Sequence, residues 1–366
     1  MQNEIPLWLT LVGALALSAL VSYLITPPVK TFAQRLGAMD VPDEERHRHA
    51  SPVPRMGGLA IFLGIVMTLL VFSDISDRLS GLMTGALLIV LMGTLDDMME
   101  LSAPLKLVVQ IVAALIAYRN GIVLNVLSNP GFSSARPFFD LGWLSMPLTV
   151  LWIVGCTNAV NLIDGLDGLA AGVSAISSLT MLVVAVFVSE PEVAIILAAI
   201  TGACIGFIPY NLSPAKIFMG DVGSQFLGYM LATVSMLGMI KLHAIVTFLV
   251  PVLAMGLPLA DTVLAFFRRV FHGQSPFHAD AGHIHHRLMA LGYSQKQTVF
   301  LLYGVSALLG LMAVFMAGKV QIARILCIGL SFGVSLFIWW VVLRRPDRSK
   351  AREDARAVRR KIRKQP

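Results

Sequence analysis

The chain has 366 residues, of which 57% are hydrophobic and 13% are charged, and its mean hydropathy is +0.78. This composition excludes an ordinary soluble protein and is typical of a protein that crosses a membrane many times. The net charge of +7 does not indicate nucleic-acid binding, because the basic residues are densest in the tail that follows the last apolar run. A basic segment in that place favours contact with anionic lipid headgroups.

Apolar runs close to the ~20 residues that a membrane-spanning helix needs recur along the chain. We count about 11 of them, at residues 7–26, 57–72, 81–95, 105–118, 143–160, 169–188, 193–208, 222–240, 244–262, 298–317 and 324–343. The sequence therefore predicts an all-α polytopic integral membrane protein. We expect a single transmembrane domain, residues 1–343, followed by a basic cytoplasmic tail, residues 344–366.

The distribution of Lys and Arg predicts the orientation, because these residues concentrate in cytoplasmic loops. If the N-terminus lies outside, most of the 28 Lys and Arg residues fall on the cytoplasmic side. An odd number of spans then places the C-terminus in the cytoplasm. In the longest outside loop, residues 119–142, the stretches 121–127 and 136–141 predict a short extracytoplasmic β-hairpin.

A polar stretch, residues 158–168, separates two of the apolar runs and contains Asn161, Asp164 and Asp167. A carboxylate inside a membrane span costs roughly 2.5–3.5 kcal/mol. The stretch is therefore predicted to form a tight loop outside the hydrocarbon core of the membrane. Its glycines allow the backbone to pass close to a ligand.

Other polar side chains fall in loops or at span ends that this topology places on the same side. They are Asp96, Asp97 and Lys106 near the third and fourth runs, Asn211, Phe218 and Asp221 after the seventh, and His283, His285, His286 and Arg287 after the ninth. Structural interpretations stay open: a hydrated helix end for the acids, a snorkelling lysine, interface packing for the phenylalanine, and an inert or zinc-binding histidine loop. For Asp261, the simplest interpretation is an ion pair with Arg268 or Arg269.

None of these groups needs to lie at the bilayer midplane, where transporters and pumps usually hold their ionisable residues. A site at the membrane face can meet a soluble anion and a lipid headgroup together. Carboxylates bind Mg²⁺, which bridges phosphates, and Lys, His and Arg stabilise the charge that shifts in phosphoryl transfer. The residues favour a magnesium-dependent transfer between a nucleotide and a lipid phosphate, with a solute or metal transporter as the alternative.

Four motifs, in this order, resemble those of the polyprenyl-phosphate N-acetylhexosamine-1-phosphate transferases, which form glycosyltransferase family 4. They are LDD at 95–97, NAVNLIDGLDG at 158–168, FMGDVGS at 218–224 and HIHHR at 283–287. The similarity begins at PRMGG, residues 54–58, and so covers nearly the whole chain. Four spaced motifs in the right order are far more specific than any one of them.

The resemblance implies a role for each candidate residue. Asn161 and Asp221 would hold Mg²⁺, with Mn²⁺ as a substitute, while Asp96 and Asp97 would lie beside the lipid phosphate and Lys106 would contact phosphate. Asp164 and Asp167 would line the nucleotide pocket, Phe218 would lie beneath the uracil, and Asn211 would brace the loops. His283, His285, His286 and Arg287 would bind the pyrophosphate or sugar. Asp96, Asp97, Asp164 and His285 are the catalytic candidates, by direct attack of the lipid phosphate or, second, through a covalent Asp intermediate.

Within that family the chain looks most like the bacterial branch that transfers N-acetylglucosamine 1-phosphate from UDP-GlcNAc to undecaprenyl phosphate and releases UMP. That reaction starts polymers of the O-antigen, common-antigen or teichoic-acid type. The sister branch, which transfers phospho-N-acetylmuramoyl-pentapeptide, carries three consecutive histidines where this chain has His-Ile-His-His. The resemblance implies a multi-pass protein of the bacterial inner membrane, an active site facing the cytoplasm, and a homodimer.

Overall fold

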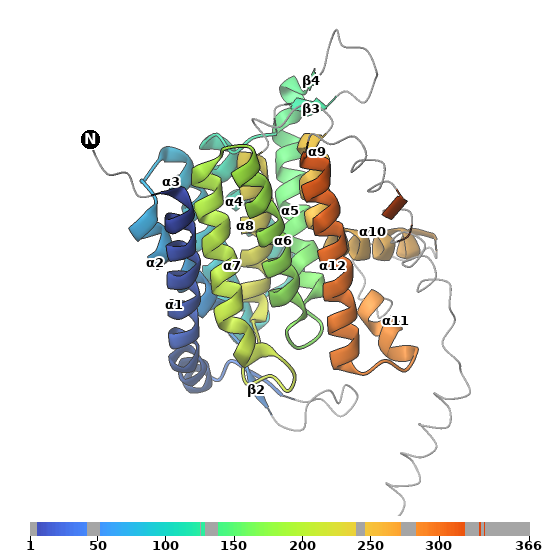
Figure 1. Cartoon of the computed structure of the whole chain (residues 1–366). Coiled ribbons are helices and arrows are strands. Elements are labelled where there is room, and N and C mark those ends of the chain that lie inside the picture. The colour runs from blue at the N-terminus through green and yellow to red at the C-terminus, as the bar shows by residue number, and fades with distance from the viewer. Residues whose placement is uncertain are drawn as a thin grey trace, which may run out of the picture.

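The computed structural model describes residues 6–41, 52–124, 126–128, 138–238, 246–271 and 283–318, together with residues 329, 330 and 333. This part of the chain is mostly helical (Figure 1). The α-helices are α1 Leu7–Leu36, α2 Gly58–Phe72, α3 Asp77–Met99, α4 Ala103–Arg119, α5 Ser145–Ile163, α6 Leu169–Phe187, α7 Pro191–Asn211, α8 Gly220–Gly238, α9 Val246–Ala254, α10 Gly256–Phe271, α11 Ile284–Ala290 and α12 Gln295–Ala317.

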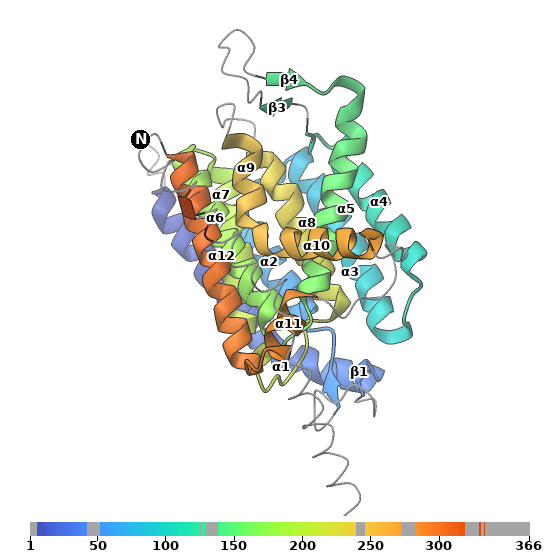
Figure 2. The same ribbon diagram turned by 90° about the vertical axis from the view of Figure 1, so that its right-hand side faces the viewer.

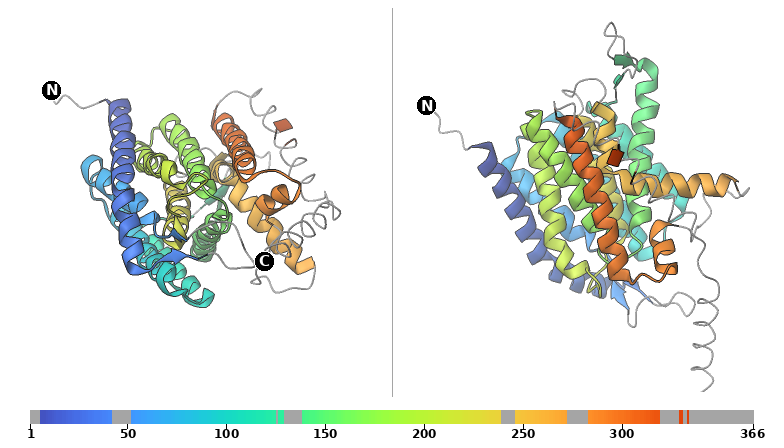
Figure 3. Two further views of the ribbon diagram at one scale, coloured as in Figure 1. Left: turned by 90° about the horizontal axis from the view of Figure 1, so that it is seen from below. Right: turned by 45° about the vertical axis from the view of Figure 1, so that its right-hand side comes forward.

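The long helices form one bundle in which α8 lies inside and α6 and α7 bury most of their residues (Figure 3, left). α1 and α2 pack against α7, α3 and α5 pack against α8, and α12 covers α6. Among the described residues, six helices are long and apolar enough to cross a membrane: α1, α3, α5 with its leading turn, α6, α7 and α12. The helical class of the prediction is confirmed, whereas the count of about 11 spans and the orientation stay predictions.

Small side chains let the first helix lie close to the interior of the bundle. Ala14, Ser18, Ser22 and Thr26 recur every fourth residue along α1 and are buried. The hydroxyl of Ser18 donates a hydrogen bond to the Ala199 carbonyl of α7 at 2.6 Å. Because lipid is as apolar as a leucine side chain, close packing and such hydrogen bonds hold membrane helices together.

Two short antiparallel ladders lie at opposite ends of the bundle (Figure 2). β1, Met39–Asp40, pairs with β2, Val53–Pro54. β3, Val126–Ser128, pairs with β4, Phe138–Asp140, within the segment where a hairpin is predicted. The β1–β2 end is also the end where the polar loops of the sequence gather.

The ninth apolar run, predicted as one span over residues 244–262, is divided in the structure. α9 ends at Ala254, and α10 starts at Gly256 and runs across the bundle (Figures 1 and 2). Pro258 lies in the first turn of α10, where its missing N–H costs no helical hydrogen bond and its fixed φ favours a new helix. The eleventh run is almost wholly, and the basic tail entirely, outside the described residues.

Candidate functional site

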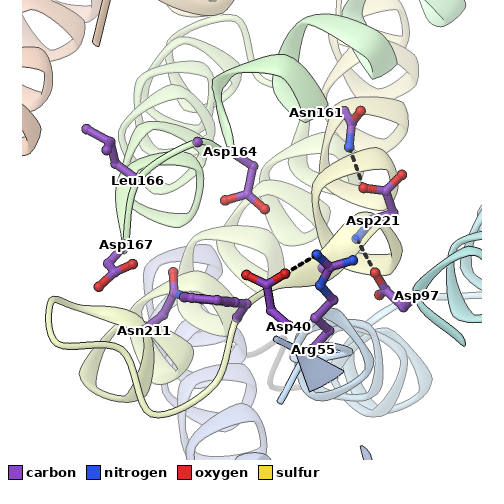
Figure 4. Close-up of a pocket in the computed structure, with 12 residues that line it drawn as sticks. Asp40, Arg55, Asp97, Asn161, Asp164, Leu166, Asp167, Asn211 and Asp221 are labelled. Atoms are coloured by element: carbon purple, nitrogen blue, oxygen red, sulfur yellow. Dashed lines mark hydrogen bonds and ion pairs between the residues drawn. The ribbon is translucent and has the colours of Figure 1, made fainter. Parts of the chain in front are cut away.

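A pocket of about 300 Å³ opens at the end of the bundle where α3, α5 and α7 end and α8 begins (Figure 4). It is lined by Asp40, Arg55, Asp97, Asn161, Asp164, Gly165, Leu166, Asp167, Asn211, Phe218, Gly220 and Asp221. Seven of these residues are candidates predicted from the sequence. The folded chain therefore brings side chains from three of the four motifs, far apart in sequence, to one cavity.

Asp221, in the first turn of α8, is the centre of the polar contacts. The Lys106 ammonium lies 3.0 Å from its Oδ2 and 2.9 Å from Oδ2 of Asp96. Asn161 donates from Nδ2 to Asp221 Oδ1 at 3.1 Å and to the Ser224 hydroxyl at 2.8 Å. The candidates from α3, α4, α5 and α8 thus form one connected cluster.

Asp97 contacts the start of α8 through the backbone. Its Oδ1 accepts a hydrogen bond from the Asp221 N–H at 2.9 Å, and its Oδ2 accepts one from Val222 at 3.3 Å. Gly220 has a φ of +73°, and a Cβ there would lie 2.2 Å from the Asp97 carboxylate. Glycine at 220 therefore allows both the turn and the close approach of Asp97.

Asp164 directly follows α5 and points into the pocket (Figure 4). Burial raises the pKa of its carboxyl to about 8, and the negative charges of Asp221, Asp97 and Asp167 add to this shift. No hydrogen bond to this carboxylate is found within the described part of the chain. The Arg55 charge opposes this shift but does not cancel it, so a cation bound here would lower the energy of the charged form.

Asp167 and Asn211 hold the loops around the pocket. Asp167 Oδ2 accepts a hydrogen bond from the Ala215 N–H at 3.1 Å. Asn211 Oδ1 accepts one from the Gly168 N–H at 3.1 Å, and its Nδ2 donates to the Ile217 carbonyl at 3.0 Å. These contacts join the loop after α5 to the loop after α7, which carries Phe218.

The histidine motif lies behind the pocket wall. His285 is buried, and a Cβ added at Gly165 would lie 2.5 Å from its Nε2, so its ring packs on the loop that carries Asp164. The rings of His285 and His286 have centroids 4.2 Å apart. Among the described residues that line the pocket itself, none is a histidine, and Arg287 is also not among them.

Asp261 of α10 binds the start of the histidine motif. Its Oδ2 lies 2.7 Å from Nδ1 of His283, and its Oδ1 accepts a hydrogen bond from the Ile284 N–H at 2.8 Å. The sequence suggested an arginine partner for this carboxylate, and the structure gives it His283. The sequence favoured Arg268 and Arg269 because they follow Asp261 closely in the chain. His283, which directly precedes α11, is brought to Asp261 only by the fold.

Asp40 and Arg55 line the pocket but were not predicted as site residues. They form an ion pair across the β1–β2 ladder. Burial of the Arg55 guanidinium lowers its pKa, but Asp40 and the more distant Asp97 and Asp221 outweigh this and raise the pKa above its ordinary value. Arg55 belongs to the PRMGG motif, and a basic residue two positions before a pair of glycines was the sequence signal for this part of the pocket.

The comparison with known proteins agrees with these motifs. The description "Glycosyl transferase family 4" belongs to the family whose sequence profile matches residues 79–239. A probable undecaprenyl-phosphate N-acetylglucosaminyl 1-phosphate transferase of Bacillus subtilis is 40% identical over 305 residues, 83% of this chain and 84% of the relative.

More distant relatives have related names. The decaprenyl-phosphate N-acetylglucosaminephosphotransferase of Mycobacterium tuberculosis strain H37Rv is 35% identical over 81% of this chain and 79% of the relative. The phospho-N-acetylmuramoyl-pentapeptide-transferase of Bacillus subtilis is 31% identical over 81% of this chain and 94% of the relative. Each of these relatives matches at least 81% of the chain, so the chain is an enzyme and belongs to the polyprenyl-phosphate hexosamine-1-phosphate transferases of glycosyl transferase family 4.

Proposed function

We propose that this enzyme transfers N-acetylglucosamine 1-phosphate from UDP-GlcNAc to undecaprenyl phosphate at the cytoplasmic face of the bacterial inner membrane. UMP is released, and the lipid-linked pyrophosphoryl sugar starts a cell-surface polysaccharide. The observation that carries the proposal is the pocket in which Asp97, Asp164, Asp167 and Asp221 meet Arg55 at one end of the bundle. A soluble diphosphate and a membrane-bound phosphate can both reach such a place.

We further propose Mg²⁺ as the cation, held by Asp221 and Asn161. The donor chemistry fits, because carboxylate and amide oxygens are hard ligands and the negative charges around Asp164 outweigh the opposing charge of Arg55. Within the described ranges, no three acidic, histidine or cysteine side chains form a closed metal site. Mg²⁺ suits this arrangement, because it usually takes one or two carboxylates and fills its shell with substrate phosphates and water. When bound, it neutralises charge on the reacting phosphates.

The nucleotide side of the pocket follows from the loops after α5 and α7. Arg55 offers a planar pair of donors that suits a diphosphate. Phe218 is half-buried in the wall and provides an apolar face for the uracil. The loop contacts of Asp167 and Asn211 hold this wall in place before the nucleotide arrives.

In the transfer step, an oxygen of the lipid phosphate attacks the phosphorus that carries the sugar. The bond from that phosphorus to the bridging oxygen breaks, and UMP leaves with this oxygen. Lys106 stabilises the negative charge that shifts between the phosphates, from its position between Asp96 and Asp221. Asp96 accepts the proton of a lipid phosphate that arrives protonated.

The hydrogen bonds of Asp97 support direct attack over a covalent intermediate. Both of its oxygens accept backbone N–H groups of α8. A carboxylate used in this way is a weaker nucleophile than a free one, because its lone pairs are already engaged. Asp97 then contributes by holding Asp221 in place.

The alternative within the family is the same reaction with another UDP-N-acetylhexosamine or with UDP-MurNAc-pentapeptide. The 31% identity to the phospho-N-acetylmuramoyl-pentapeptide-transferase of Bacillus subtilis supports the second of these donors. The experiment is UMP release by purified, detergent-solubilised protein given Mg²⁺, undecaprenyl phosphate and each UDP-sugar in turn. Lipid-dependent release with UDP-GlcNAc supports the proposal. UMP release only with another UDP-sugar would keep the reaction but assign the enzyme to another branch of the family. No UMP release from folded protein with any donor would refute the proposed function and favour the transporter alternative.

A further inference from the structure

A chain of three carboxamides runs from Asp221 away from the pocket and into the helix bundle. Gln225 donates from Nε2 to Asp221 Oδ2 at 3.0 Å. Gln110 donates from Nε2 to Gln225 Oε1 at 2.8 Å, and Asn158 donates from Nδ2 to Gln110 Oε1 at 2.7 Å. The amides come from α8, α4 and α5, so the chain joins the three helices behind the acidic cluster.

The carboxylate at one end fixes the direction of every amide. An ionised Asp221 only accepts hydrogen bonds, so Gln225 must present its NH₂ group to it. This turns the Gln225 oxygen toward Gln110, which must then present its own NH₂ group, and the same holds for Asn158. Gln110 is 2% and Gln225 1% exposed, so water has little access to either amide.

The amides form the inner of two neighbouring rungs between α4 and α8. Lys106 and Gln110 lie one turn apart on α4, and Asp221 and Gln225 lie one turn apart on α8. The outer rung is the ion pair of Lys106 and Asp221, and the inner rung is the hydrogen bond between the two glutamines. In the proposed reaction, substrate phosphates and Mg²⁺ would compete for the outer rung, whereas the inner rung is neutral and buried.

We propose that Gln110 and Gln225 are positioning residues that keep Asp221 and Lys106 aligned while substrate separates this ion pair. The inference rests on the proposed function, since it needs an anionic substrate that binds between the two charges. The glutamines touch no substrate themselves. They act by holding the carboxylate orientation and the spacing of the two helices during the transfer step.

The test uses the double variant Gln110→Leu, Gln225→Leu in the full-length protein in detergent. The double replacement removes both partners of the buried bond between the glutamines, which is close to neutral for stability, whereas a single replacement leaves an amide unpaired. Asn158 keeps its hydrogen bond to the Val154 carbonyl, and Asp221 keeps Lys106 and Asn161. We therefore expect a thermal midpoint near that of the wild type. We expect kcat to fall by about 10- to 100-fold, because a small displacement of a catalytic group costs up to about 10²-fold, while KM for the UDP-sugar stays within about threefold.

A matched control is Thr233→Val, a buried polar position further along α8. The Thr233 hydroxyl donates to the Tyr229 carbonyl of its own helix at 2.7 Å and does not join the amide chain. This variant should keep wild-type kcat. Wild-type kcat in the double variant, or an equal loss in the control, overturns the positioning role. A wild-type protein that releases no UMP refutes the proposed function, and the inference falls with it.

Discussion

Asp97 caps the helix that carries Asp221, although the two residues are 124 positions apart in the chain. The Asp97 carboxylate accepts the Asp221 N–H at 2.9 Å and the Val222 N–H at 3.3 Å. The first N–H groups of a helix have no partner within the helix, and a carboxylate also interacts favourably with the helix dipole there. An acid from α3 thus takes the place of a local N-cap and fixes where the central carboxylate of the site lies.

Asp97→Asn should lower both stability and activity. The amide keeps one acceptor oxygen but places an NH₂ group against the second N–H, which leaves buried donors unpaired at a cost of about 1–3 kcal/mol. We expect a lower thermal midpoint and at least about tenfold slower transfer. Unchanged thermal stability with complete loss of transfer would instead indicate that the carboxylate itself reacts, as in a covalent mechanism.

Gly220→Ala should disturb the same contact from the other side. The residue has a φ of +73°, and the new Cβ would lie 2.2 Å from the Asp97 carboxylate. A left-handed conformation alone costs a non-glycine residue about 1–2 kcal/mol. Gly304→Ala on α12 is the control, because a Cβ there meets nothing within 4 Å. Thermal unfolding should show destabilisation in the first variant and none in the second, and equal midpoints would contradict the cap.

Arg55→Leu should weaken binding of the UDP-sugar more than it slows turnover. The loss of a charged, two-pronged donor is expected to raise KM by about tenfold or more. Asp40→Asn should have a smaller effect, since Asp40 only orients the guanidinium. Arg35→Leu, an exposed arginine near the end of α1, removes the same charge elsewhere and should leave KM unchanged. Equal effects of the Arg55 and Arg35 variants would reduce the role of Arg55 to general electrostatics.

The pKa of Asp164, raised to about 8 by burial and nearby acids, predicts how stability depends on pH. The unfolded chain releases this proton near pH 4, whereas the folded protein keeps it to about pH 8. The contribution of Asp164 to stability is therefore complete below pH 4 and is lost between pH 4 and 8, by at most about 1.4 kcal/mol per pH unit. Without divalent cations, Asp164→Asn should remove this part of the pH dependence of thermal unfolding. An identical pH profile in the variant would show that another group is responsible.

Composition and hydropathy determined the fold class of this protein and predicted that most of the site residues lie near one another. A charged side chain inside the membrane costs free energy, so the acids near residues 96, 164 and 221 are expected outside the hydrocarbon. Because the chain changes sides at every span, the predicted spans place all three on the same side. The motifs then identified the family. Seven predicted side chains line one pocket for this reason, and Lys106 and Asp96 adjoin it.

Only the tertiary structure decided which atoms of these side chains meet. The cap from Asp97 to α8, the Asp40–Arg55 pair, the bond from Asp261 to His283 and the chain from Asp221 to Asn158 all join distant segments. Each depends on how far a helix is rotated and how deeply it lies against its neighbours. Hydropathy records only that a run is apolar, and a buried glutamine such as Gln110 leaves almost no mark on it. Packing therefore decides rotation and depth, and with them the geometry of the site.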